Sequence, residues 1–342
     1  MIKKHLLSYS VDELKNKLLN ICDKPFRLKQ ILQWIYSHHV VDFEQMTNVP
    51  KDILRDLSNE FENVLPEIVD IKKSYDNSVK FLLKLRDEAL IEMVYIPTEK
   101  KNTLCISTQV GCSRNCSFCA TAKIGLKRNL TTEELVSQFF VANGYFKNDK
   151  MTNIVLMGMG EPLDNIESLI NFLNIMTANE GLDFSGRKIT ISTCGIVPKI
   201  YTLADMDLKF KLAISLNSAI DSKRSYMMPI NDTYPLNELK KAVLYFRSKS
   251  RFRVTFEYIM ISDFNMGKED VRALKKFCGD ISCKINLLKW NEIHGLAWKS
   301  PTEKQIESFI KEINHLPIAV TYRKSRGGDI AGACGQLAGG QN

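Results

Sequence analysis

The sequence predicts an α/β fold: an open, partial (β/α)6-type barrel with a small N-terminal helical domain and a β-hairpin extension. Two observations lead to this class. After residue 100, short apolar runs alternate with amphipathic segments, a pattern typical of parallel strands connected by helices. The chain holds only six such strand–helix units, whereas a closed barrel has eight and takes roughly 250 residues. The expected barrel is therefore incomplete.

Residues 1–65 are expected to form a helical accessory domain. Apolar side chains recur at helical spacing from Val11 to Cys22 and again from Phe26 to Tyr36, and a third helix is expected after Pro50. Residues 66–100 read differently. Two strand-like runs there, "SVKFLLKL" and "ALIEMVYIP", are separated by a polar "RDE" turn, which predicts a β-hairpin.

Residues 101–325 are expected to form the barrel. The candidate strands share an apolar character and a short length, and they occupy residues 103–108, 153–158, 188–193, 211–216, 254–261 and 284–290. Residues 319–325 add a last strand. Residues 326–342 follow, and six of the fourteen residues 327–340 are glycine. We expect this segment to be a mobile loop with Cys334 at its centre.

The composition narrows the class of protein. At 342 residues, with 44% hydrophobic and 25% charged side chains, the chain resembles an ordinary globular protein. No apolar run reaches the roughly 18 residues of a membrane-spanning helix, and the first residues lack the apolar region of a signal peptide. We therefore expect a cytoplasmic protein without a membrane partner. In that compartment nine cysteines indicate metal binding or redox catalysis rather than a disulfide framework.

The charge is uneven along the chain. The net charge is +8; residues 1–65 carry nine basic and nine acidic side chains, while residues 66–130 carry eleven basic and seven acidic ones. This surplus permits a polyanionic partner, but charge alone favours an ordinary solvated face.

Three cysteines, Cys112, Cys116 and Cys119, stand in a CxxxCxxC pattern just after the first barrel strand. A structural zinc site is closed by four ligands, usually two spaced pairs, and no matching second pair is obvious. A disulfide would leave one thiol over. Three thiolates suit a four-iron cluster with one iron open to an outside ligand, so the pattern favours a [4Fe–4S] cluster over zinc.

The cysteine pattern resembles that of the radical S-adenosylmethionine (SAM) superfamily, in which SAM binds the open iron. Further motifs make the resemblance closer. "CISTQVGCSRNCSFC", "MGMGEPL", "ISTCGIVP", "FEYIMI" and "YRKSRGGDIAGACGQLAG" are similar to those of the dual-specificity 23S rRNA/tRNA adenine-C2 methyltransferases. The likeness runs over nearly the whole chain. It implies a radical SAM barrel and a methyltransferase that modifies one adenine in the peptidyl-transferase region of 23S rRNA and the adenine 3′ to the anticodon in tRNA.

The chemistry of such a reaction requires a methyl carrier. C2 of adenine is electron-poor and cannot attack the methyl group of SAM, so a radical route is needed. A thiolate is the strongest side-chain nucleophile and a natural carrier, and Cys334 in its glycine-rich segment is the candidate. The resemblance implies that one SAM methylates Cys334 and that a second yields the radical. It also implies that Cys105 resolves the adduct through a transient Cys105–Cys334 disulfide and that Glu92 accepts a proton.

The resemblance also implies a set of residues around SAM. Glu161 in "GMGEP" can accept a hydrogen bond from the SAM ammonium group. The family usually has histidine where Asn217 stands, and asparagine can still bond a ribose hydroxyl. The expected cofactor-binding residues are Gly160, Glu161, Ser192, Ser215, Leu216, Asn217 and Asn291. The other four cysteines, Cys22, Cys194, Cys278 and Cys283, are expected to be buried apolar thiols.

RNA contact is expected from basic residues that flank the pocket, with the helical domain recognising RNA by shape. These residues are Lys123, Lys127, Arg128, Arg323, Lys324 and Arg326. An external electron donor of the flavodoxin or ferredoxin type and a monomeric state complete the expectation. Three alternatives stay open: the related C8-methylating resistance enzyme, a radical SAM enzyme with a non-RNA substrate, and a non-catalytic iron–sulfur RNA-binding module.

Overall fold

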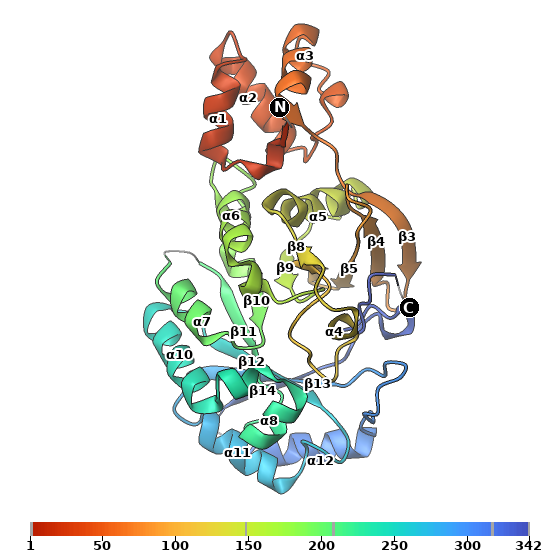
Figure 1. Ribbon diagram of the computed structural model, residues 1–342, viewed down its shortest axis with the longest axis vertical. Helices are drawn as coiled ribbons and strands as arrows, with labels where there is room; N and C mark the ends of the chain where they lie inside the picture. The colour runs from red at the N-terminus through yellow and green to blue at the C-terminus, as the bar shows by residue number, and fades with distance from the viewer. Residues whose placement is uncertain (1–2, 148, 207–208, 316–317, 341–342) are drawn as a thin grey trace.

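The structure is a computed structural model that describes residues 3–147, 149–206, 209–315 and 318–340. The outermost residues of the predicted N- and C-terminal segments, 1–2 and 341–342, lie outside the described residues. The helical part lies at one end of the molecule, and a large sheet with its helices makes up the rest (Figure 1).

The N-terminal region contains the three helices expected from the apolar spacing. They are α1 (Val11–Leu19), α2 (Pro25–Tyr36) and α3 (Lys51–Glu60). Ser10 and Glu13 form a capping box that starts α1. Two short elements were not foreseen: β1 (Lys4–His5) pairs in parallel with β2 (Phe61–Glu62) and so joins the two ends of this region. The remaining elements are the 3₁₀ helices η1 (Leu6–Ser8) and η2 (Phe43–Gln45).

One ten-stranded sheet forms the body of the protein, in the order β14-β13-β12-β11-β10-β9-β6-β5-β4-β3. Seven strands run parallel: β6 (Lys101–Cys105), β9 (Asn153–Leu156), β10 (Ile189–Thr193), β11 (Lys211–Ser215), β12 (Val254–Met260), β13 (Cys283–Lys289) and β14 (Ala319–Arg323). The predicted α/β class is confirmed. Each of the six expected strands is present within a few residues, and β14 is the last strand that was expected over residues 319–325.

The predicted hairpin is present and belongs to the same sheet. β4 (Val79–Lys84) pairs antiparallel with β5 (Leu90–Thr98), and β5 pairs antiparallel with β6. A third strand, β3 (Glu67–Lys73), was not predicted; its side chains are exposed or half-buried, so it lacks the apolar signal of a core strand. We call β3, β4 and β5 the extension. Division of the chain at residues 65, 100 and 325 stays a prediction.

Helices connect the parallel strands. They are α5 (Thr132–Tyr145), α6 (Ile166–Thr177), α7 (Val197–Ala204), α8 (Asp221–Met227), α9 (Ile230–Thr233), α10 (Leu236–Lys249), α11 (Lys268–Cys278) and α12 (Glu303–Ile313). Short elements lie in the loops: α4 (Ala120–Ile124), η3 (Pro162–Asn165), η4 (Gly186–Lys188), η5 (Gly328–Ile330) and the paired strands β7 (Gln109–Val110) and β8 (Arg128–Asn129). Among the described residues, every helix is too short or too polar to cross a bilayer.

The glycine-rich tail, residues 326–340, is partly packed against the rest of the protein, and the mobility expected of it stays a prediction. Ala333, Gln336, Leu337 and Ala338 are all buried. Two of its glycines, Gly335 and Gly339, allow close backbone approach, because a Cβ there would lie 3.3 Å from the carbonyl oxygens of Phe118 and Leu90. The tail lies beside the extension (Figure 1).

Candidate active site

One cavity opens at the carboxyl ends of the parallel strands, the edge at which barrels of this kind carry their chemistry. About 990 Å³ of it is free of protein atoms, counted out to the solvent at its mouth. Residues from β9, β10, β11, β12, β13 and β14 reach it, together with the loop after β7 and the tail.

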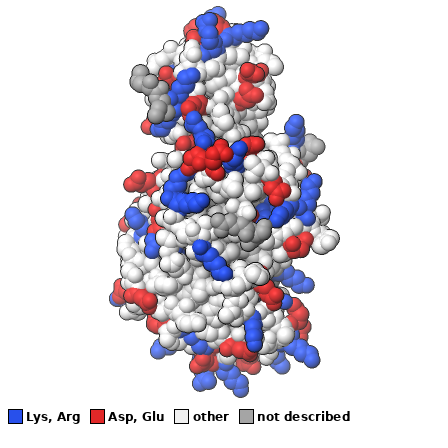
Figure 2. Space-filling view, turned by 45° about the vertical axis from the view of Figure 1, so that its right-hand side comes forward, with Lys and Arg blue, Asp and Glu red and all other residues white. Residues whose placement is uncertain are grey.

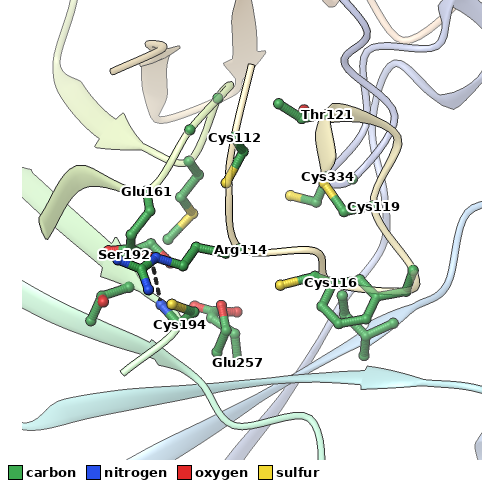
Figure 3. A pocket seen from close by; sticks show the side chains of 18 of the residues that line it. Cys112, Arg114, Cys116, Cys119, Thr121, Glu161, Ser192, Cys194, Glu257 and Cys334 are labelled. Carbon is green, nitrogen blue, oxygen red and sulfur yellow. Dashed lines mark hydrogen bonds between the residues drawn. The ribbon is translucent and has the colours of Figure 1, made fainter. Parts of the chain in front are cut away.

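The three pattern cysteines line this cavity from one loop, residues 111–119. The side chains of Cys112, Cys116 and Cys119 point into the same space (Figure 3). Within the described chain, no three His, Cys, Asp or Glu side chains converge closely enough to hold a single metal ion. Three thiols that line one cavity suit a multi-iron cluster with one iron left open to an outside ligand. Burial raises the pKa of the Cys112 thiol to about 12, and a bound metal would reverse this.

Hydrogen bonds from distant segments fix this loop. The indole of Trp298 donates to the carbonyl of Ser117 at 3.0 Å, and that of Trp290 donates to Phe118 at 3.2 Å. The amide of Ser117 donates to the carbonyl of Met227 at 2.9 Å. Both tryptophans follow β13, so the last third of the chain holds the cysteine loop in place.

Glu161 lines the cavity from the segment between β9 and η3. It is 4% exposed, and its two carboxylate oxygens accept from the amides of Leu163 at 3.0 Å and Cys194 at 2.8 Å. Burial raises the pKa of Glu161, while these two amides act in the opposite direction. Gly160 also lines the cavity. A carboxylate with remaining acceptor capacity in a buried site suits recognition of an ammonium group.

The other predicted cofactor residues divide into two groups. Ser192, Ser215 and Asn217 line the cavity, whereas Leu216 is fully buried behind it. Asn217 accepts from the amide of Ile259 at 3.0 Å, so its oxygen is already engaged. Asn291 lies near the tail instead: its amide donates to the carbonyl of Cys334 at 3.4 Å.

Cys334 faces the cavity beside Cys119 (Figure 3). Its side chain is exposed, but that exposure is to the cavity, and protein surrounds it closely enough that burial raises the pKa of the thiol. The positive charge of Arg323 acts in the opposite direction. Cys105, at the end of β6, lines an adjoining narrow cavity that Cys334 also lines. Both are free thiols, so the two predicted redox partners face one space.

Glu92 lies outside the residues that line either cavity. It is 2% exposed, forms an ion pair with Lys80 at 2.9 Å, and accepts from the amides of Ala338 and Gly339. In this arrangement both of its oxygens are engaged, and the role of proton acceptor stays a prediction.

Sequence reasoning missed several residues of the site. Arg224 is fully buried and donates to the carbonyls of Cys194 and Leu216, which ties together the ends of β10 and β11. Cys194 is buried as expected but also lines the cavity, as does Glu257. A buried arginine carries no local sequence signal, because its partners lie on other strands.

The predicted RNA-binding cations are placed unequally. The guanidinium of Arg128 is bound by Asp87 and Glu134, and that of Arg326 donates to backbone carbonyls. Lys127 and Lys324 are exposed, whereas Arg323 lines the cavity. Basic and acidic residues are interspersed over the face in Figure 2 rather than gathered in one basic area.

Comparison with protein families gives two matches. The radical SAM superfamily matches residues 106–278, and the ribosomal RNA large subunit methyltransferase N-terminal domain matches residues 4–62. Together they cover the helical region and most of the barrel.

Individual relatives are similar over nearly the full length. A protein of Clostridium botulinum (strain Alaska E43), named probable dual-specificity RNA methyltransferase RlmN, is 44% identical over 98% of this chain and 96% of its own length. The dual-specificity RNA methyltransferase RlmN of Desulfotalea psychrophila is 42% identical over 97% of this chain and 94% of its own length. The crystal structure of a radical SAM methyltransferase from Sphaerobacter thermophilus is 35% identical. It superposes with a TM-score of 0.93 over 98% of this chain and 99% of that one.

Proposed function

Because this chain belongs to the radical SAM superfamily and, within it, to the RlmN family of dual-specificity RNA methyltransferases, we propose that it methylates C2 of adenine in two RNAs. The targets are one adenine in the peptidyl-transferase region of 23S rRNA and the adenine 3′ to the anticodon in tRNA. One [4Fe–4S] cluster and two SAM molecules per turnover would supply the one-electron chemistry and the methyl group. Cys112, Cys116 and Cys119 would hold the cluster.

The single observation that carries this proposal is the position of Cys334. Its thiol faces the same cavity as the three loop cysteines, and it shares a second cavity with Cys105. A methyl carrier must reach both the donor and the substrate base, and a resolving thiol must reach the carrier. Cys334 would carry the methyl group as a thioether, and Cys105 would then form the transient disulfide that is reduced from outside.

The roles of the remaining residues follow from their surroundings. Gly160, Glu161, Ser192, Ser215 and Asn217 would bind SAM, with Leu216 and Asn291 supporting the wall of the site. Glu92 would accept the proton released from the base, which requires its oxygens to exchange one of their present partners.

The proposed partners are the two RNAs and a flavodoxin- or ferredoxin-like electron donor, and the protein would act in the cytoplasm as a monomer. The target adenine has to leave its stack to reach the cavity, and loop bases do so at the lowest cost. Lys127 and Lys324 are the exposed cations best placed for phosphates, while the helical region would recognise RNA by shape.

The test is mass spectrometry and primer extension on 23S rRNA and tRNA from cells with and without the gene. We expect 2-methyladenine in both RNAs only when the gene is present. Methylation at C8 would assign the chain to the resistance-type reaction, and unmodified RNA would refute the proposal. Release of 5′-deoxyadenosine by the reconstituted protein with SAM and dithionite would exclude a purely RNA-binding role.

A further inference from the structure

The extension β3–β5 holds the segment that carries Cys334, with contacts on both sides of that residue. Figure 1 shows the C-terminal segment lying beside β3 and β4. The contacts fall into an upstream group at residues 326–331 and a downstream group at residues 338–339.

The upstream group binds the turn between β3 and β4. The amide of Gly327 donates to Asp76 at 2.9 Å, and the hydroxyl of Ser74 donates to Asp329 at 2.6 Å. Arg326 adds a bond to the carbonyl of Pro97 at the end of β5, at 2.8 Å. These contacts fix the start of the tail against the extension.

The downstream group binds a buried ion pair. The amides of Ala338 and Gly339 donate to one oxygen of Glu92, at 2.7 and 3.1 Å. The other oxygen of Glu92 pairs with Lys80 at 2.9 Å. Lys80 also donates to the carbonyl of Ala331 at 3.2 Å, so this one ammonium group contacts both the upstream segment and the carboxylate that holds the downstream one.

The pair is unusual for its burial. The side chains of Lys80 and Glu92 are 4% and 2% exposed. Their strands pair with Leu82 opposite Glu92 and Lys80 opposite Val94, so the two charges are diagonal neighbours on the hairpin face that the tail covers. Burying two charges is costly, and apolar residues of similar size often stabilise a fold at least as well. A buried pair whose remaining bonds all go to the tail is better explained by positioning than by stability.

We infer that Lys80 is a positioning residue for Cys334 and that the extension holds the Cys334 segment at the cavity. The catalytic consequence of this rests on the proposed function. With Lys80 in place, Glu92 is oriented to accept from the tail amides and Ala331 is fixed. Without Lys80 the Cys334 segment loses one direct bond, and the carboxylate that holds its far side loses its counter-charge.

The first test is hydrogen exchange of the purified, anaerobic holoprotein with Lys80→Met and a matched control, Lys84→Met. Lys84 lies on the same strand and also pairs with glutamates, but it is one-third exposed and bonds only Glu67 and Glu88. We expect exchange in residues 331–340 to accelerate at least about tenfold in Lys80→Met, with barrel strands unchanged. The control should exchange as the wild type does. Wild-type exchange of the tail in Lys80→Met would overturn the inference.

The second measurement separates positioning from a merely structural role. In the loaded enzyme we expect Lys80→Met to raise the ratio of 5′-deoxyadenosine released to methylated RNA severalfold. The reason is that a misplaced methyl thioether would react less often with the radical that SAM supplies. An unchanged ratio at any overall rate would overturn the positioning role. If the wild type methylates no RNA, the proposed function fails, while the exchange experiment still decides whether Lys80 holds the tail.

A surface variant keeps the inference testable if Lys80→Met does not fold. Asp329 is exposed, so Asp329→Ala removes the bonds to Ser74 and Tyr75 with little risk to the core. We expect exchange in residues 326–332 to accelerate severalfold. Exchange at the wild-type rate would show that the extension does not hold the tail in place.

Discussion

Two segments bring thiols to the same cavity, and they are held in different ways. The cysteine loop, residues 111–119, receives hydrogen bonds from the indoles of Trp290 and Trp298, which belong to the barrel half of the chain. The tail is held by the charged groups of the extension and by residues of α4, which directly follow the loop. The amide of Ala120 donates to the carbonyl of Gly335, and the hydroxyl of Thr121 donates to that of Leu337, both at 2.7 Å.

This difference implies an order of dependence. The main supports of the loop come from barrel elements, whereas the tail rests on residues that directly follow the loop. A perturbation of the loop should therefore reach the tail, but a perturbation of the tail should leave the loop and any cluster it holds intact. The asymmetry suits a reaction in which the loop holds a fixed cofactor while the tail carries the group that moves.

The largest expected effect comes from removing one thiol from the cysteine loop and, in a separate variant, one thiol from the tail. Cys116→Ala should lose the iron and its visible absorbance along with all methyl transfer, because two ligands do not hold a cluster. Cys334→Ala should keep iron content and absorbance near the wild type and also lose methyl transfer, a drop of at least about a thousandfold. Iron analysis and an RNA methylation assay give both readouts.

Equal loss of iron in the two variants would contradict the proposed order of dependence. Full activity of Cys334→Ala would contradict the role of this residue as methyl carrier. A useful control is Cys22→Ala, since Cys22 lies in the helical region, away from both segments, and should behave as the wild type.

The next effect is a backbone one at the start of the loop. Gly111 has a positive φ of 81°, and a Cβ there would lie 1.7 Å from the carbonyl oxygen of Gly125. Gly125 also has a positive φ, 71°, but a Cβ there meets nothing within 4 Å. Gly111→Ala should therefore cost about 3 kcal/mol or more and most of the iron, while Gly125→Ala should cost only about 1–2 kcal/mol of backbone strain.

Thermal unfolding and iron content of the two glycine variants decide the point. Equal destabilisation would show that the left-handed backbone, and not the contact with Gly125, makes Gly111 necessary. Loss of iron in Gly125→Ala alone would contradict the description of the loop.

The sequence predicts the loop far better than the tail, and the reason is physical. The strands of the barrel are apolar and local, so periodicity finds β9 through β13 almost to the residue. The spacing of the three cysteines likewise states its chemistry within eight residues. The position of the Cys334 segment, in contrast, depends on contacts between residues some 250 positions apart in the sequence, such as the hydrogen bond from Lys80 to Ala331.

Local patterns mislead where a second segment covers a surface. A lysine side chain is ordinarily exposed, yet Lys80 is buried because the tail lies over that face of the hairpin. β3 gives no apolar signal because it is an exposed edge strand. The same limit hid Arg224 in α8, whose partners are carbonyls just after the ends of β10 and β11.

A smaller effect tests the indole support of the loop. Trp298→Phe removes the donor to Ser117 but keeps an aromatic ring near Phe264, whose ring centroid lies 4.8 Å from that of Trp298. One unsatisfied carbonyl costs about 1 kcal/mol, so a chelator should bleach the cluster roughly fivefold faster. Trp34→Phe is the control, because Trp34 donates to Asn48 in the helical region. Equal bleaching rates in the wild type and Trp298→Phe would show that the indole of Trp298 does not stabilise the cysteine loop.

The smallest effect concerns an ion-pair cluster that joins β8 to the extension. Arg128 in β8 binds Asp87, in the turn between β4 and β5, and Glu134 at the start of α5. The guanidinium lowers the pKa of Asp87 from 3.8 to about 2. A carboxylate with a depressed pKa stabilises the fold above its unfolded pKa, and that stabilisation is lost as the pH falls from about 4 to about 2.

Since Asp87 is half exposed, solvent screening keeps this contribution to no more than about 1 kcal/mol. Asp87→Asn should therefore lower the Tm of the apoprotein by about 1–3 °C at pH 7. The difference should shrink at pH 3, where much of the paired stabilisation has gone. Asp23→Asn, an exposed residue in the loop before α2, should show no difference at either pH. A difference for Asp87→Asn that grew on acidification would contradict the sign of the linkage, and the pairing with Arg128 would then not be what stabilises this contact between the loop region and the extension.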